Sequence, residues 1–196
     1  MKALTIFLFS LFSLAILNSV QAQSDSTRRT SIKTGFGLAV SDGKQESGVG
    51  TVFSIGWQKS LGQKNKFRLN PNMVIGGFIP LMTDVRDQYY RITSVGMNLH
   101  YDLVKYRAVS LVATGGAFIN YSRGLLATGG DPGTDDSDYF YRLYYGGLIS
   151  AAIRIDPPKS RLAYEIRPIT LQQGDRSFLL FYPMINLDFK LGRKDK

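Results

Sequence analysis

Apolar and polar residues alternate with a period of two along most of the chain. In the segment 30–42, Ile32 and Phe36 fall on one side of an extended chain and Lys33 falls on the other. Successive side chains of a strand point to opposite faces, so this alternation predicts strands with one apolar face and one small or polar face. The pattern recurs in eight segments: 30–42, 49–60, 66–81, 89–103, 107–122, 139–156, 160–172 and 177–192.

The charged residues of these strands are assigned to the polar face. In the segment 139–156, Arg154 alternates with Ile153 and Ile155, and near the end of the chain Asp188 alternates with Leu187 and Phe189. Lys33 in 30–42 and Asp102 in 89–103 are likewise assigned to the polar face by their position in the alternation. We therefore expect an apolar face without charge.

Strand length and connection length favour a membrane barrel over a soluble sandwich. Strands of about sixteen residues exceed the usual five or six of globular sheets and suit a tilted membrane crossing. Turns are expected at 62–65, 104–106 and 157–159, whereas 123–138 is expected to be one long Gly- and Asp-rich loop. Short turns on one side and longer loops on the other are typical of outer-membrane barrels, which puts the long loop outside.

Aromatic residues near the strand ends point the same way, because amphipathic rings settle at membrane interfaces. Two girdles are expected. One contains Trp57, Phe67, Tyr101 and Phe189, and the other contains Tyr121, Tyr139 and Tyr141. A bilayer offers no water to an open sheet edge, so the strands must close. The expected fold is all-β, an eight-stranded antiparallel up-and-down transmembrane β-barrel over 30–192.

The two ends of the chain are expected to lie outside the barrel. Lys2, the apolar stretch 3–17 and the small residues around Ala22 predict a signal peptide over 1–22, cleaved after Ala22. A short tail over 23–29 and a basic tail over 193–196 complete the chain. The sequence has no Cys, which excludes disulfides and lipoprotein processing. The expected location is the outer membrane of a Gram-negative bacterium.

The formal net charge of the chain is +9. Export argues against nucleic acid as the partner, and no nucleic-acid-binding motif gathers the charges. Many basic residues fall at the expected periplasmic ends, where they either meet anionic lipid headgroups or keep the turns soluble. They are Lys59, Lys64, Lys66, Lys105, Arg107, Lys159, Arg193, Lys194 and Lys196.

Charged residues on the inward face are the main candidate site. The basic ones are Lys33, Arg68, Arg142, Arg154, Arg161, Arg167 and Lys190, and their candidate partners are Asp102, Asp156, Glu165 and Asp188. The expected network consists of Arg68, Asp102, Arg154, Glu165, Arg167 and Asp188. Side chains fill the interior of an eight-stranded barrel, so a structural ion-pair core is favoured over an anion passage.

Nothing in the sequence predicts catalysis, a metal or a cofactor. His100 is the sole histidine, and we expect it inside the barrel and hydrogen-bonded. No second His and no Cys accompany it as zinc ligands. The stretch Asp131–Asp138 holds four carboxylates but lacks the Gly and terminal Glu of a helix-flanked calcium loop, so we expect a solvated loop.

In its signal, alternating strands and strand-end aromatics, the chain resembles the small outer-membrane β-barrel families typified by the OmpA transmembrane domain and OmpX. Strands such as 95–101 and 185–189 carry the resemblance. It implies assembly by the barrel-assembly machinery, with Phe189 as the recognised aromatic although a basic tail follows. Such families include adhesins, narrow channels, structural barrels and lipid-modifying enzymes.

The favoured function is a non-enzymatic structural or interaction role, with outer-membrane lipid around the wall and an external partner at 123–138. The alternatives are a narrow channel for small solutes, a lipid-modifying enzyme and a soluble ligand-carrying barrel. A soluble barrel would place the apolar face inside and the charges outside.

Overall fold

The computed structural model describes residues 30–42, 47–62, 65–80, 89–127, 137–157 and 160–191. The expected signal peptide over 1–22, the tail over 23–29 and the basic tail over 193–196 lie outside these residues. The strands are β1 (Thr30–Asp42), β2 (Gly48–Leu61), β3 (Phe67–Ile79), β4 (Tyr89–Tyr106), β5 (Val109–Ala127), β6 (Ser137–Ile155), β7 (Leu162–Gly174), β8 (Leu179–Phe181) and β9 (Met184–Lys190). A 3₁₀ turn, η1 (Asp175–Ser177), separates β7 from β8.

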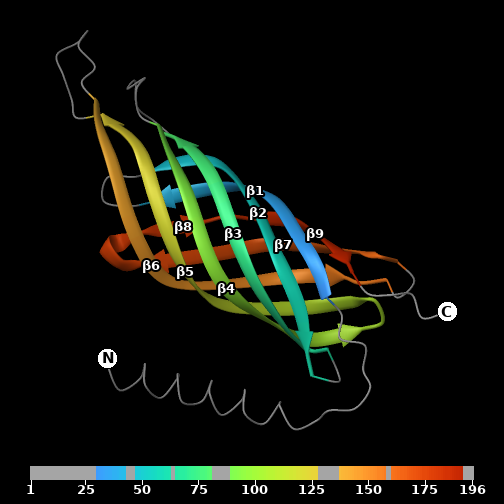
Figure 1. Ribbon diagram of the computed structural model, residues 1–196. Helices are drawn as coiled ribbons and strands as arrows, with labels where there is room; N and C mark the ends of the chain where they lie inside the picture. The colour runs from blue at the N-terminus through green and yellow to red at the C-terminus, as the bar shows by residue number, and fades with distance from the viewer. Residues whose placement is uncertain are drawn as a thin grey trace, which may run out of the picture.

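The strands close into one antiparallel barrel (Figure 1). Each strand from β1 to β7 pairs with the next in the chain, and β8 and β9 both pair with β7 on one side and β1 on the other. Together β8 and β9 fill a single place in the wall, so the ring has eight positions. The predicted eight-stranded antiparallel barrel is confirmed.

The eighth wall strand is interrupted at Tyr182–Pro183, where the sequence predicted one continuous segment. Proline has no backbone N–H and cannot donate to a strand ladder, so the regular pairing stops there. The Tyr182 N–H instead donates to the Thr170 carbonyl of β7 at 2.9 Å. The wall therefore stays connected across the break.

Two predicted connections are shorter than the sequence suggested. Residues 104–106 were expected to form a turn, but they continue β4 beyond a bulge at Leu103, and Arg107–Ala108 make the turn instead. The bulge adds one residue to β4, after which pairing with β5 resumes. In the expected loop 123–138, residues 123–127 and 137–138 are paired strand, because the antiparallel ladder between β5 and β6 continues through them. Residues 128–136 lie outside the described part of the chain.

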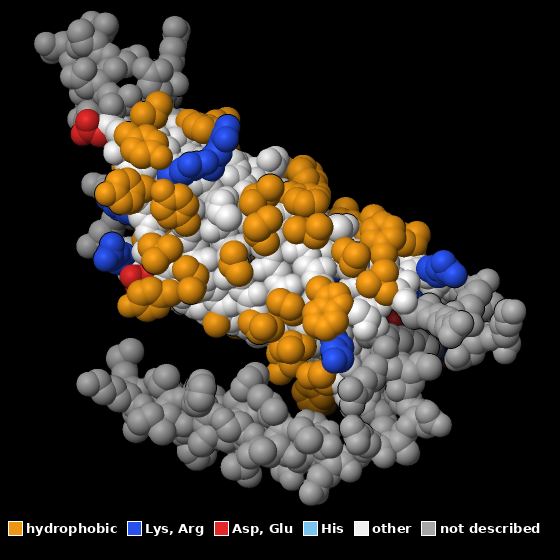
Figure 2. All heavy atoms as spheres, viewed as in Figure 1, with side chains coloured by type: hydrophobic (Ala, Val, Ile, Leu, Met, Phe, Trp, Pro, Cys, Tyr) orange, Lys and Arg blue, Asp and Glu red, His pale blue; other side chains and the backbone are white. Residues whose placement is uncertain are grey.

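The outer wall of the barrel is apolar (Figure 2). Side chains such as Phe36 and Ile149 are 58% and 63% exposed, while charged side chains such as Glu165 and Asp188 are buried inside. A water-soluble protein does not expose so large an apolar surface. The soluble ligand-carrying barrel needs the opposite arrangement and is therefore wrong. No helix in the described residues is long and apolar enough to cross a membrane.

Both ends of the described chain lie at the same end of the barrel. The Leu191 N–H donates to the Thr30 carbonyl at 2.7 Å, beside the start of β1. The last residues of β3 and β5 and the first residues of β4 and β6 lie at the opposite end (Figure 1). We refer to these as the terminal end and the loop end.

Candidate functional site

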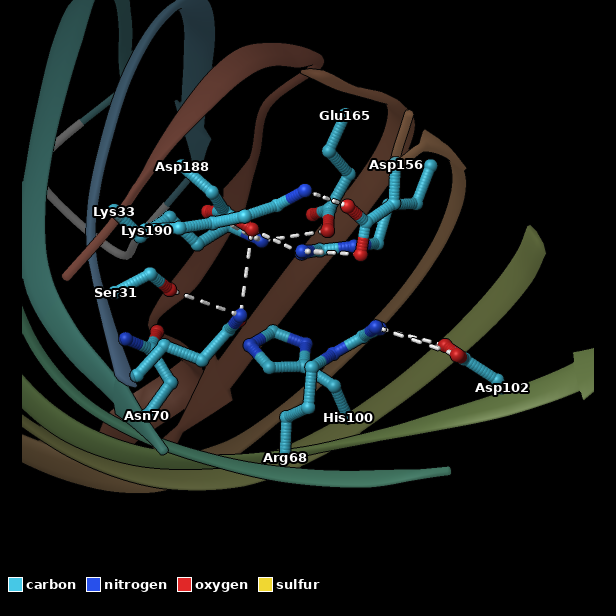
Figure 3. Close-up of polar contacts among 12 residues, drawn as sticks. Ser31, Lys33, Arg68, Asn70, His100, Asp102, Asp156, Glu165, Asp188 and Lys190 are labelled. Carbon is cyan, nitrogen blue, oxygen red and sulfur yellow. Dashed lines mark hydrogen bonds and ion pairs between the residues drawn. The ribbon is translucent and has the colours of Figure 1, made fainter. Parts of the chain in front are cut away.

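The lumen near the terminal end holds a network of buried charges (Figure 3). Glu165 of β7 is at its centre: its two oxygens lie 2.5 Å from Lys33 Nζ and 2.7 Å from Arg167 Nη2. Asp188 of β9 pairs with Arg154 of β6 and lies 3.9 Å from Lys33 Nζ. The closing strands β1, β7 and β9 are thus joined through ion pairs as well as through backbone hydrogen bonds.

The network extends to the rim and across the lumen. Arg154 Nη2 lies 3.5 Å from Asp156, which also pairs with Lys190. On the far wall, Arg68 donates two hydrogen bonds to the Asp102 carboxylate, at 2.7 and 3.3 Å. Five basic and four acidic side chains take part in these ion pairs. These ion pairs hold the wall together. Because the positive and negative groups nearly balance, the network has little net positive charge to attract anions.

The structure places the six expected network residues inside, but in two groups. Glu165, Arg167, Arg154 and Asp188 belong to the central group with Lys33, while Arg68 and Asp102 form their own pair. Two further residues, Ser31 and Gln58, join them. Ser31 and Asp188 both accept from the Gln58 amide, at 3.4 and 3.3 Å, and their polar-face parity is the signal that could have found them.

Two basic residues expected to point inward are not part of this layer. Arg161 is exposed, because it lies in the turn before β7 where the strand alternation does not yet apply. That prediction was wrong. Arg142 is half-buried near the loop end, far along β6 from Arg154.

His100 is fully buried beside Arg68, its partner across the β3–β4 ladder. Its Nδ1 lies 2.7 Å from Thr114 Oγ1 of β5. Within the described residues, no group of three or more His, Cys, Asp or Glu side chains could hold a metal. The geometry around His100 is that of a hydrogen-bonded interior residue.

The lumen toward the loop end is filled by aromatic and aliphatic side chains, which were not predicted from the sequence. Phe78 stacks on Tyr90 with ring centroids 5.0 Å apart, and Tyr144 stacks on Phe178 at 4.7 Å. Phe118 contacts Phe178 at 5.9 Å. We call this the aromatic layer, and its further members are Ala39, Val52, Val74, Ile92, Phe140, Leu148, Leu180, Tyr182 and Met184.

A small cavity lies where the charged and aromatic layers meet. Its walls include Lys33, Asn70, Arg167, Tyr182 and Asn186, and its volume is about 10 Å³. A space of that size holds about one water molecule. It offers no room for a solute.

The expected girdle residues lie on the outer wall, toward the two ends. At the terminal end, Phe67 contacts Tyr101 at a ring distance of 4.6 Å, and Trp57 and Phe189 flank Ile32 in the ladders of β1. At the loop end, Tyr121, Tyr139 and Tyr141 are exposed on β5 and β6. Basic groups accompany rings at the terminal end: Lys59 lies 5.9 Å from the Trp57 ring and Arg107 lies 5.3 Å from the Tyr106 ring.

The expectation that the apolar face carries no charge was wrong. Arg91 of β4 and Arg123 of β5 are both exposed on the outer wall. The sequence already indicated this position. Arg91 is four residues from Val95, and an even separation along a strand puts both side chains on the same, apolar face. We nevertheless expected that face to be free of charge.

No family model and no curated protein matches the sequence. Solved structures do. Neisserial surface protein A is 12% identical, with a TM-score of 0.55 over 83% of this chain and 97% of that chain. Ail, the attachment invasion locus protein of Yersinia pestis, is 12% identical, with a TM-score of 0.57 over 85% of this chain and all of that chain. Ail in complex with the heparin analogue sucrose octasulfate gives a TM-score of 0.56.

These neighbours are eight-stranded outer-membrane β-barrels. The chain therefore has the transmembrane β-barrel fold. Within that class it has the fold of the small OmpA- and OmpX-like barrels, as its strand pattern predicted. The predicted outer-membrane location agrees with this fold and with the apolar wall.

Proposed function

We propose that this protein is a non-enzymatic barrel of the Gram-negative outer membrane that acts through its external end. The observation that supports this function best is the filled lumen. Ion pairs occupy one half of it and aromatic rings the other, so the available surfaces are the wall and the ends. Outer-membrane lipid would surround the wall, and the barrel-assembly machinery would recognise Phe189 during biogenesis.

The β5–β6 hairpin is the proposed contact surface. Each of its strands has 19 residues, against 13 in the neighbouring β7, and pairing with β7 ends at Gly146, so β6 projects beyond β7. Tyr139, nearer the tip of the hairpin on its outer face, is 62% exposed. The sequence of its connection carries Asp131, Asp135 and Asp136. An exposed ring followed in the sequence by several carboxylates suits a partner with a basic surface.

The negative charge of these aspartates makes the proposed partner different from the ligand in the Ail complex. Sucrose octasulfate is a polyanion, and the aspartates of this hairpin would repel such a molecule. A basic protein surface is therefore the occupant that we propose here.

The test uses the folded barrel in lipid nanodiscs and two immobilised probes, polylysine and heparin. We expect binding to polylysine and little binding to heparin. Replacing 128–136 by an Asn-Gly turn should abolish polylysine binding while the barrel keeps its heat-dependent gel shift. The control variant Lys105→Gln, at the other end of β4, should bind as the wild type does. Unchanged polylysine binding by the loop variant would contradict the proposal.

A narrow channel is the alternative with the next best support, because charged groups line half of the lumen. The cavity of about 10 Å³ gives a solute no path, which makes this function less favourable than the first. A lipid-modifying enzyme has less support still, since His100 is buried and its Nδ1 contact is a threonine hydroxyl.

A further inference from the structure

Two like charges face each other on the outer wall. Arg91 and Arg123 are direct partners in the β4–β5 ladder and both are exposed. Like charges directly opposite in a sheet destabilise it, and arginine on the lipid face of a barrel is costly unless it lies near an interface. Among the described residues neither arginine has an ion-pair partner, and Arg91 Nε donates to the Tyr89 hydroxyl. An anion between the two guanidinium groups would relieve this repulsion.

The surroundings of the pair are aromatic and apolar. One ladder step toward the terminal end, Thr93 pairs with Tyr121. One step toward the loop end, Tyr89 pairs with Leu125, and Tyr141 of β6 is the other ladder partner of Arg123. Phenol groups on three sides can add hydrogen bonds to a polar headgroup while their rings contact acyl chains.

The height of the pair on the wall matches a membrane interface. Arg91 is ten residues from the girdle residue Tyr101 along β4. At about 3.3 Å per residue and a tilt of about 40°, this places the pair about 25 Å above Tyr101 along the barrel axis, which is the height of the apolar band of outer-membrane barrels. The guanidinium groups thus stand level with lipid headgroups at the loop end.

A hollow of about 580 Å³ lies on the wall and extends to Gly77 of β3. It is lined mainly by apolar residues of β1, β2, β3 and β8, among them Leu38, Val40, Ile79 and Phe181. Gly77 both lines the hollow and pairs directly with Arg91. A Cβ atom at Gly77 would have only the Tyr89 ring within 4 Å, at 3.9 Å, so glycine keeps the wall low between the hollow and Arg91.

We propose that Arg91 and Arg123 bind a phosphate group of an outer-leaflet lipid, with an acyl chain of the same lipid in the neighbouring hollow. Two guanidinium forks can share one phosphate through charge-assisted hydrogen bonds. The assignment to the outer leaflet rests on the proposed function, which turns the loop end outward.

The test measures binding of lipid A, with and without its phosphates, to the detergent-solubilised barrel by native mass spectrometry. The wild type should prefer the phosphorylated form. The double variant Arg91→Gln with Arg123→Gln should lose about tenfold in affinity or more, since both charged donors are removed. The double variant Arg91→Lys with Arg123→Lys keeps the positive charges but loses the paired donors of the guanidinium groups. Its affinity should lie between those of the wild type and the glutamine variant. Lys105→Gln is the matched control and should bind as the wild type does.

Three results would overturn the site. They are equal binding of dephosphorylated lipid A, unchanged binding by the glutamine variant, or full displacement of the lipid by inorganic phosphate alone. A heat-dependent gel shift of each variant shows that it has folded. Orientation is tested separately, with Gly133→Cys and a membrane-impermeant maleimide on intact cells. Labelling only after lysis would overturn the proposed function and the outer-leaflet assignment, whereas the arginine site is decided by the binding data.

Discussion

At the scale of single residues, the buried carboxylates are the most constrained groups in the barrel. Glu165 is shared by Lys33 and Arg167, and Asp188 by Arg154 and Lys33. Each carboxylate therefore faces two buried cations. Removing a partner from such a cluster costs more than the pair itself contributes, because the remaining charge stays buried without compensation.

Glu165→Gln should accordingly destabilise the barrel by about 3–5 kcal/mol, since Lys33 and Arg167 lose a shared counter-charge. The free energy of unfolding can be measured by urea titration of the protein folded into vesicles. Arg161→Gln in the exposed turn before β7 is the control, and its effect should stay within about 0.5 kcal/mol. A Glu165→Gln variant as stable as the wild type would show that the ion pairs contribute little.

Strand parity identified the inward residues but not their partners. Arg68, Asp102 and Glu165 were placed on the polar face because the pleat fixes which side each residue faces. The pairing of Lys33 with Glu165 spans 132 positions in the chain and depends on the stagger of the closed barrel, which no local pattern contains. Parity also assigns Arg91 to the outer wall and Phe118 to the lumen, and both were overlooked because each face was assumed to be uniform.

At the scale of elements, the seam between β1 and the interrupted β8–β9 strand is where the barrel closes. The ladder β1–β9 ends with Gly37 opposite Met184, next to Pro183. A Cβ atom at Gly37 would overlap the carbonyl oxygen of Pro183, which is backbone and cannot rotate away. The seam therefore requires glycine at this position for steric reasons.

Gly37→Ala should slow or prevent closure of the barrel. The expected result is a refolding yield into detergent that is reduced several-fold, read from the fraction of protein that shows the heat-dependent gel shift. Gly115→Ala on β5 is the matched control, because a Cβ atom there has nothing within 4 Å, and its yield should equal that of the wild type. Equal yields for the two variants would mean that the seam adjusts to a methyl group.

At the scale of the whole molecule, two different kinds of packing close the lumen in series. The charged layer blocks the terminal half through ion pairs such as Lys33–Glu165, and the aromatic layer blocks the loop half through stacked rings such as Tyr144–Phe178. A solute or ion would have to displace both.

The intact barrel in a planar bilayer should therefore show no steady conductance above that of the bare membrane. Phe178→Ala opens space in the aromatic layer and should remain closed, because the charged layer is intact. Only Phe178→Ala combined with Glu165→Gln, which disturbs both layers, is expected to give measurable current. Steady conductance of the wild type would contradict the sealed lumen and favour the channel function, and the same current from Phe178→Ala alone would show that the charged layer does not block ions.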